Sequence, residues 1–240
     1  MMKRKIFSSI FVGLALGALP FLQFSCDDGR IFDENVHVER EGGTVKLRGR
    51  ISGIDSWPGG YSIVLAGFEG DNAYAQTAVG IAPEVDGTVE MVLSGIPSGV
   101  SDIEICAINK LRKRIASFYR IDYSEQADTV YLEAGDIDAG MYRAIQTDIF
   151  DRSCVTCHGG STEAAAGLYL TDDKSYSSLV RVVADRSDED LFLVEPGNSA
   201  ESFLRIVLHE DVVRYNHTNI ITSGNELDLI DDWIDHGALQ

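Results

Sequence analysis

Cys154-Val155-Thr156-Cys157-His158 is a C-x-x-C-H run, and it decides the fold that we expect for the C-terminal half of the chain. This pattern is the attachment signature of a c-type haem. The thiols of Cys154 and Cys157 would add across the two vinyl groups of the porphyrin. His158 follows directly, so its imidazole can reach the iron as the proximal ligand. The sequence therefore predicts one covalent haem c held by these three residues.

Two other chemistries use a C-x-x-C pair. A structural zinc site usually takes four Cys or His ligands, and a Cys2His2 site completed by His209 or His217 is an open alternative. A thioredoxin-like redox pair is typical of a βαβ segment, and no such pattern surrounds residue 154. Cys106 stands alone in a predicted strand, where we expect a buried core thiol.

The first 25 residues have the pattern of a secretory signal. Positions 3–5 are basic, and the apolar stretch 6–24 is interrupted by small residues and a proline, unlike a membrane-spanning helix. Ser25-Cys26 resembles the cleavage point of a lipoprotein signal, in the loose form of Bacteroidota-like lipoproteins. Cys26 would then be lipidated and hold the protein on a membrane. Ordinary secretion, with Cys26 uninvolved, is the alternative.

These features place the protein outside the cytoplasm. We expect an exported lipoprotein, on the periplasmic face or the cell-surface side of an outer membrane, with residues 26–35 as its tether. Export agrees with the haem prediction, since c-type haem is attached outside the cytoplasm.

The chain is strongly acidic, with a formal net charge of −18 from 38 Asp and Glu against 20 Lys and Arg. Cleavage after residue 25 removes three basic residues and no acid, which brings the charge to −21. Such a surface argues against nucleic acid and anionic lipid headgroups as partners. The chain that remains after cleavage is long enough for one large domain or two small ones.

Residues 36–135 alternate between strand-like segments and turns. Clusters of Gly, Pro, Asn and Asp separate the segments 44–51, 61–65, 74–81, 88–93, 102–108, 115–121 and 129–132. Short strands at this spacing predict an antiparallel, Ig-like β-sandwich of about seven or eight strands. We find no catalytic pattern in this domain, which would serve as a spacer or a binding module.

The hydrophobic period changes at residue 136. Met141, Ile145 and Ile149 share one helical face, and we expect Asp136 or Asp138 to cap this helix. The helix leads directly into the C-x-x-C-H run.

Two further helices are predicted, over 199–208 and from Ser223 to Gly237. Ser223 and Glu226 have the spacing of a capping box, and Gly237 is suited to end the helix. We expect the acidic residues of this last helix to face water. Residues 136–240 are therefore predicted to form a small all-α domain.

This order of elements resembles a single-haem cytochrome c domain, and in more detail the planctomycete-type cytochrome c domain. The resemblance is carried by Ile149-Phe150, the run from Cys154 through His158 to Gly160, Gly167-Leu168-Tyr169-Leu170, Pro196-Gly197-Asn198-Ser199, Ser202-Phe203-Leu204, Glu226-Leu227, and Ile230 through Trp233-Ile234 to Gly237-Ala238. It covers about 136–240, does not account for the sandwich, and implies a cytochrome c-like haem domain in an exported protein.

The resemblance fails at the distal ligand. Members of the family usually place a methionine between the third helix and the last, but this chain has no methionine after Met141. His217 lies nearest the expected place, and His209 closes the third predicted helix. We expect His217 to be the distal ligand, with His209 or an open iron position as alternatives. Two histidine ligands give a lower reduction potential than a Met/His pair.

Three functions follow from these features. The first is a membrane-anchored cytochrome that passes single electrons to or from an unknown redox protein. The second is a binding or scaffold lipoprotein, whose sandwich contacts a glycan or protein and whose C-x-x-C-H domain is vestigial or zinc-bound. The third is a peroxidase-like haem enzyme with an open distal position. No nucleophile–base pattern supports a hydrolase.

Overall fold

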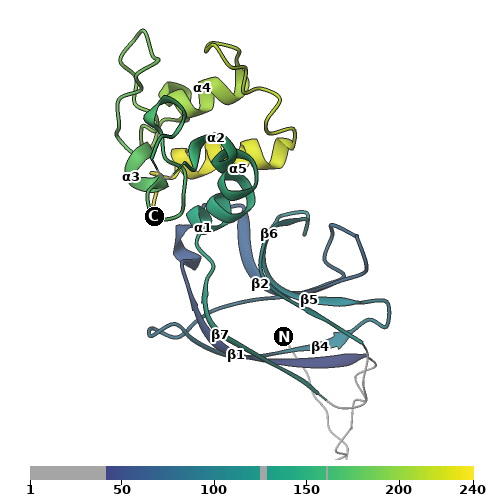
Figure 1. The fold of residues 1–240 in the computed structure, drawn as a ribbon. Helices are drawn as coiled ribbons and strands as arrows, with labels where there is room; N and C mark the ends of the chain where they lie inside the picture. Colours follow the sequence, from purple (N-terminus) through teal and green to yellow (C-terminus); the bar gives the residue numbers. More distant parts are fainter. Residues whose placement is uncertain (1–41, 125–128, 161) are drawn as a thin grey trace, which may run out of the picture. The chain divides into compact units, whose positions relative to one another are not determined.

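The computed structural model describes residues 42–124, 129–160 and 162–240 (Figure 1). The predicted signal and tether, with Cys26, lie outside the described residues. The described part is a mixed β/α structure, in which the strands come first and the main helices follow from Met141 onward. No helix within the described part is long and apolar enough to cross a bilayer.

Seven strands in the described part form two sheets, and each overlaps one of the seven predicted segments, although β7 runs on to Asp138, past the predicted start of the helical domain at residue 136. Their bounds are β1 Gly43–Ser52, β2 Tyr61–Phe68, β3 Thr77–Gly80, β4 Thr88–Ile96, β5 Asp102–Asn109, β6 Arg114–Asp122 and β7 Val130–Asp138. One sheet has the order β4-β1-β7 and the other β3-β2-β5-β6. A short 3-10 turn, η1 (Ile54–Ser56), follows β1.

The prediction of a purely antiparallel sandwich is wrong at one strand pair. β7 runs parallel to β1, from Val45 opposite Val130 to Ser52 opposite Asp138, with a shift of register between Arg48 and Gly49. The chain reaches β7 by crossing from the edge strand β6 of the other sheet. It therefore enters beside β1 by a crossover rather than a hairpin, and a crossover permits parallel pairing.

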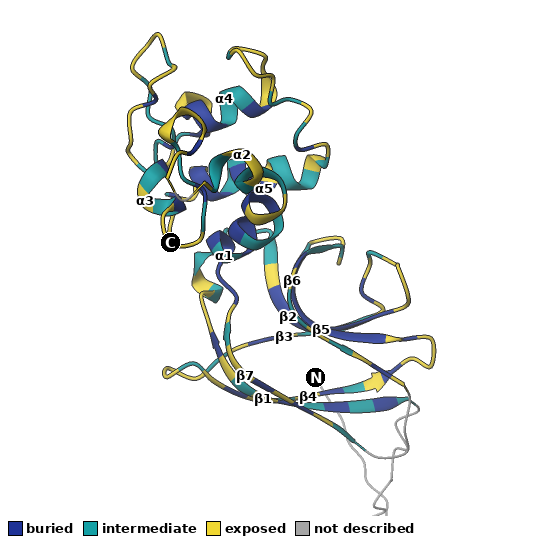
Figure 2. Cartoon of the chain, in the orientation of Figure 1, coloured by how far each residue is buried: buried dark blue, intermediate teal, exposed yellow. Residues whose placement is uncertain are grey.

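The main core lies between the inner faces of the two sheets and continues among the helices (Figure 2). On β1, Val45, Leu47 and Ile51 are buried, while most residues between them keep some exposure, as strand alternation requires. β5 is buried on both faces instead. Its second face lies in a smaller cluster that contains Cys106, which confirms the predicted buried thiol.

The first helix begins differently from the prediction. Asp136 belongs to β7, and the residue before the helix is Gly140, so neither Asp136 nor Asp138 is its N-cap. Asp138 Oδ1 accepts a hydrogen bond from Gly140 N, and Ser56 Oγ accepts one from Met141 N, at 2.9 and 2.8 Å. A distant serine therefore satisfies a free N–H of the first turn, the role usually taken by the cap.

Three helical segments follow one another without a break. They are α1 (Met141–Ile145), the π-helix η2 (Gln146–Cys154) and α2 (Val155–His158). Met141, Ile145 and Ile149 are all fully buried, which confirms the predicted apolar face. The C-x-x-C-H run thus lies at the end of a continuous helical stretch that is anchored in the core.

The remaining helices are short, apart from the last. They are η3 (Ala165–Gly167), α3 (Ser175–Leu179), η4 (Ser199–Glu201), α4 (Phe203–His209) and α5 (Gly224–Asp235). The helix predicted over 199–208 is present but breaks at Ser202 into η4 and α4.

The ends of α5 agree with the prediction only in part. Ser223 is the N-cap residue, but its side chain makes no capping hydrogen bond, so the predicted capping box is not formed. Gly237, with φ of 96°, ends the helix as predicted. Two acids that were expected to face water are half-buried, because Asp231 binds Arg205 and Asp232 accepts a hydrogen bond from Tyr61.

A buried carboxylate lies on the second face of β5. Glu104 is fully buried and pairs with Arg114, whose guanidinium also lies 4.7 Å from the centre of the Phe68 ring. A buried, ionised carboxylate has lost its hydration shell. It therefore depends on the paired guanidinium of Arg114 for stabilisation.

Removing that cation should destabilise the sandwich strongly. We expect Arg114→Ala to lower the free energy of unfolding by about 3–5 kcal/mol, since Glu104 is left buried and uncompensated. Urea denaturation measures the change. Arg48→Ala is the control, because Arg48 pairs with Glu90 at an exposed site and should matter little. Equal effects of the two substitutions would contradict the prediction.

Candidate functional site

The two cysteines of the motif have different surroundings. Cys154 is the last residue of η2 and packs half-buried against the main core, whereas Cys157, in α2, is exposed. Both thiols are free. Burial, and next the neighbouring Cys157, raise the pKa of Cys154 to about 11. The motif therefore offers two reduced thiols on adjacent turns, one facing the core and one facing outward.

A tight turn ends the motif. A β-carbon on Gly159 would lie 2.5 Å from the carbonyl oxygen of Val155, closer than any side chain tolerates. Glycine at this position lets the chain leave α2 immediately after His158. The next residues then pass back beside the histidine.

The segment 168–170 holds His158 from two directions. The Nδ1 atom of His158 lies 3.2 Å from the carbonyl oxygen of Leu168, and the amide of Leu170 donates to the carbonyl oxygen of His158 at 2.8 Å. A carbonyl can only accept, so the contact places the imidazole proton on Nδ1. Nε2 is then the nitrogen with a free lone pair, which is the usual arrangement for a metal-binding histidine.

The structure brings His217 to His158. Their ring centres are 6.3 Å apart, and the ring planes differ by 34°. Tyr215 packs edge-on against His217, with ring centres 5.4 Å apart. The Nδ1 atom of His217 is buried and has no hydrogen-bond partner among the described residues.

The loop that carries His217 is ordered by its own side chains. Asn216 Oδ1 accepts hydrogen bonds from the amide and the hydroxyl of Thr218, at 2.8 and 2.7 Å. The amide of Ile220 donates to the carbonyl oxygen of His217, and Ile221 is buried in the core. This Asx turn with its apolar anchor presents the imidazole toward α2.

His209 has a different partner. It ends α4, and its Nε2 atom lies 3.5 Å from Oδ2 of Asp231 on α5. The same carboxylate oxygen accepts from Arg205. Of the two histidines weighed for the distal position, His217 is therefore the one that the structure places against His158.

The spacing of the two imidazoles fits one metal ion bound between them. Metal–imidazole bonds of about 2.0–2.1 Å on opposite sides of an ion put the ring centres roughly 6 Å apart. The observed 6.3 Å agrees with this value. Burial, and more weakly the nearby His217, lower the pKa of His158, which favours the neutral imidazole that a metal requires.

The zinc alternative finds less support. Within the described ranges, no three His, Cys, Asp or Glu side chains gather closely enough to hold a metal ion. A closed zinc site needs four such ligands. The described residues thus offer a pair of histidines, and not a Cys2His2 cluster.

Two cavities lie away from the motif. One, of about 330 Å³, is lined on the sandwich side by Tyr61, Asn109 and Lys110 and on α5 by Asp228 and Asp232. The other, of about 470 Å³, lies along β1 and β7. Neither contains a residue of the predicted site.

Comparison with models of known protein families gave no match to this chain. Comparison with curated proteins gave none either.

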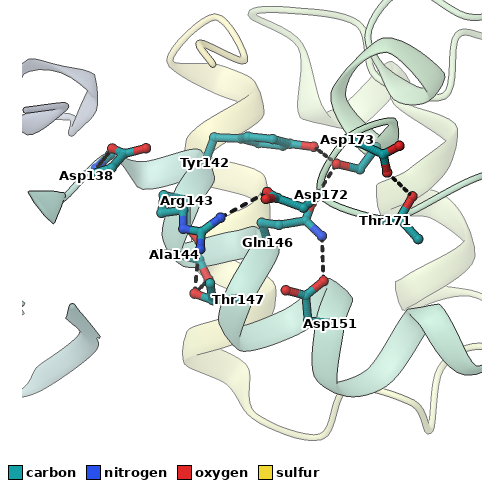
Figure 3. A network of polar contacts seen from close by, with 12 residues as sticks. Asp138, Tyr142, Arg143, Ala144, Gln146, Thr147, Asp151, Thr171, Asp172 and Asp173 are labelled. Atoms are coloured by element: carbon teal, nitrogen blue, oxygen red, sulfur yellow. Dashed lines mark hydrogen bonds and ion pairs between the residues drawn. The ribbon is translucent and has the colours of Figure 1, made fainter. Parts of the chain in front are cut away.

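One residue near the motif escaped the sequence analysis. Gln146 is fully buried at the start of η2 and belongs to a polar network with Tyr142 and Asp151 (Figure 3). Its signal was present, because Tyr142, Gln146 and Phe150 repeat every four residues and a polar group interrupts that apolar series.

Proposed function

We propose that this protein is an exported, membrane-anchored c-type cytochrome that carries single electrons to or from a redox protein. One haem c would be bound covalently by Cys154 and Cys157, with His158 and His217 as axial ligands. The observation that carries this proposal is the proximity of His217 to His158 of the C-x-x-C-H motif, with ring centres 6.3 Å apart.

The residues present suit a porphyrin better than a bare ion. A haem brings four nitrogen ligands of its own and supplies a one-electron couple when bound. The chain then has to provide two ligands, which is the number that the site offers. Each thiol would add across a vinyl group, with sulfur bonding one carbon and the proton going to the other. This addition has no leaving group and needs no oxidant.

The protein residues set the character of the couple. His158 is oriented by the Leu168 carbonyl, which raises the basicity of the ligand nitrogen. A second imidazole in place of a thioether favours the ferric state, so the potential would be lower than with Met/His ligation. A filled sixth position also argues against the peroxidase-like alternative.

The remaining parts of the proposal rest on the sequence. Residues 136–240 would be a planctomycete-type cytochrome c domain, supported by the order of α1, the motif, α4 and α5. Lipid on Cys26 would hold it at the outer membrane. The acidic surface supports a partner that is neither nucleic acid nor an anionic membrane surface.

A binding lipoprotein is the second candidate. The cavity of about 330 Å³ beside Tyr61 favours it, since an aromatic ring, amides and carboxylates line one hollow. In this case the sandwich would contact a glycan or a protein, and the purified protein would show no Soret band.

Haem attachment is the first test. Protein made with a cytochrome c maturation system should keep its haem through acid–acetone extraction, because thioether bonds survive acid. Mass spectrometry should find the adduct on the peptide that contains Cys154 and Cys157. A variant with both cysteines changed to Ala is the control and should lose the haem. Clean extraction of haem from the natural protein would sink the proposal.

The distal ligand is the second test. His217→Ala should leave the haem attached but open the sixth position, giving a high-spin spectrum and new carbon monoxide binding. His209→Ala is the matched control, since His209 pairs with Asp231, and its spectrum should stay low-spin. The assignment is overturned if the control becomes high-spin and His217→Ala does not.

The anchor is the third test. Cys26→Ala should move the protein from the membrane fraction to the soluble fraction, because the acyl chains are its only proposed attachment. Cys106→Ala, which alters a buried thiol of the sandwich, is the control. Unchanged fractionation of the Cys26 variant would contradict lipidation.

A further inference from the structure

Gln146 has a fully satisfied side-chain amide in the core. Its Nε2 atom donates to Asp151 Oδ1 at 2.7 Å (Figure 3). The same nitrogen donates to the carbonyl oxygen of Leu170 at 3.0 Å. Its Oε1 atom accepts from the hydroxyl of Ser175 at 2.6 Å. Both N–H groups and the oxygen therefore have partners inside the protein.

The network has one consistent direction. Ser175 donates to Gln146, so its oxygen is left to accept from the hydroxyl of Tyr142. A flipped amide would aim Oε1 at two acceptors, Asp151 and the Leu170 carbonyl. Burial raises the pKa of Tyr142 to about 12, so this phenol remains a donor at neutral pH. Such a chain of donors strengthens each member and fixes the amide in place.

The Leu170 carbonyl connects this amide to the candidate site. The side-chain amide of Gln146 donates to the carbonyl of Leu170. The backbone amide of Leu170 in turn donates to the carbonyl oxygen of His158. Two residues earlier, the carbonyl of Leu168 accepts from His158 Nδ1. The segment 168–170 is thus bonded to the histidine on one side and to Gln146 on the other.

We propose that Gln146 is a positioning residue for the proximal ligand, acting on His158 through the segment 168–170. This inference rests on the proposed cytochrome function. By holding Leu170, Gln146 keeps the Leu168 carbonyl against Nδ1, and this bond governs both the direction of the ring and its basicity as a ligand.

The π-helix explains why this position can serve. In a π-helix the backbone hydrogen bonds join residues five apart, and in η2 the side chains of Gln146 and Asp151, five residues apart, meet. Asp151 takes one N–H of the amide and leaves the other directed at Leu170. The widened turn therefore aims a core amide at the backbone beside the motif.

Gln146→Met tests the inference in the full-length haem protein. Methionine keeps the length and volume of the side chain but cannot donate to Leu170. With the Leu168 contact loosened, the imidazole becomes a weaker donor to iron, and the midpoint potential should shift upward. The electron paramagnetic resonance signal of the low-spin ferric state should shift as well, because the ring is free to turn.

Thr147→Ala is the matched control. Thr147 lies next to Gln146 and bonds only carbonyl groups of its own helix, at Arg143 and Ala144. The substitution leaves the segment 168–170 and its bonds to Gln146 and His158 in place, so the midpoint potential should equal that of the natural protein. An unchanged potential in Gln146→Met, or an equal shift in the control, overturns the inference.

A second measurement separates this inference from the proposed function. Amide hydrogen exchange at Leu170 should become about tenfold faster in Gln146→Met but not in Thr147→Ala, whether or not haem is attached. Absence of haem with faster exchange would defeat the cytochrome proposal alone. Normal exchange would defeat the positioning role alone. If Gln146→Met does not fold, Gln146→Leu removes the same donor with another apolar side chain of similar size.

Discussion

The hydrogen bonds around Ala139 are the constraint on which the helical half depends. The indole N–H of Trp57 donates to the carbonyl of Ala139, and the amide of that residue donates to the carbonyl of Ser52. Ser56 then takes the first free amide of α1, at Met141. Because the chain is helical without a break from Met141 to His158, these bonds at the end of β1 fix where the C-x-x-C-H run lies.

The two histidines of the site are held in unlike ways. His158 ends the continuous helical stretch and is braced by a backbone segment on its flank. His217 belongs to a loop that is ordered by an Asx turn and one buried isoleucine. In the proposed cytochrome the proximal ligand is therefore fixed by the fold, whereas the distal ligand depends on a local turn. Loss of that turn would convert an electron carrier into a ligand-binding haem protein.

Local pattern was sufficient to locate the strands and the apolar face of the first helix. Alternation located all seven strands, and it placed Cys106 in a core. The parallel pairing of β7 with β1 was not predictable, because a strand shows the same alternation of apolar and polar residues whether it pairs parallel or antiparallel. The π geometry of η2 was missed because its buried residues, Gln146, Ile149 and Phe150, fit an α-helix equally well. Half-burial of Asp231 depends on Arg205, which the spacing within α5 does not reveal.

The nitrogen without a partner at His217 bears on what the site is for. A buried polar atom that is left unsatisfied costs about 1–3 kcal/mol, and Nδ1 of His217 finds no hydrogen bond among the described residues. Two imidazoles this close repel each other when both are protonated, so the pair is stable only while at least one ring is neutral. Burial lowers the pKa of His158 and so favours its neutral form. In the proposed cytochrome both rings would have to be neutral to bind the iron, and the ring centres lie about as far apart as two ligands of one metal ion require.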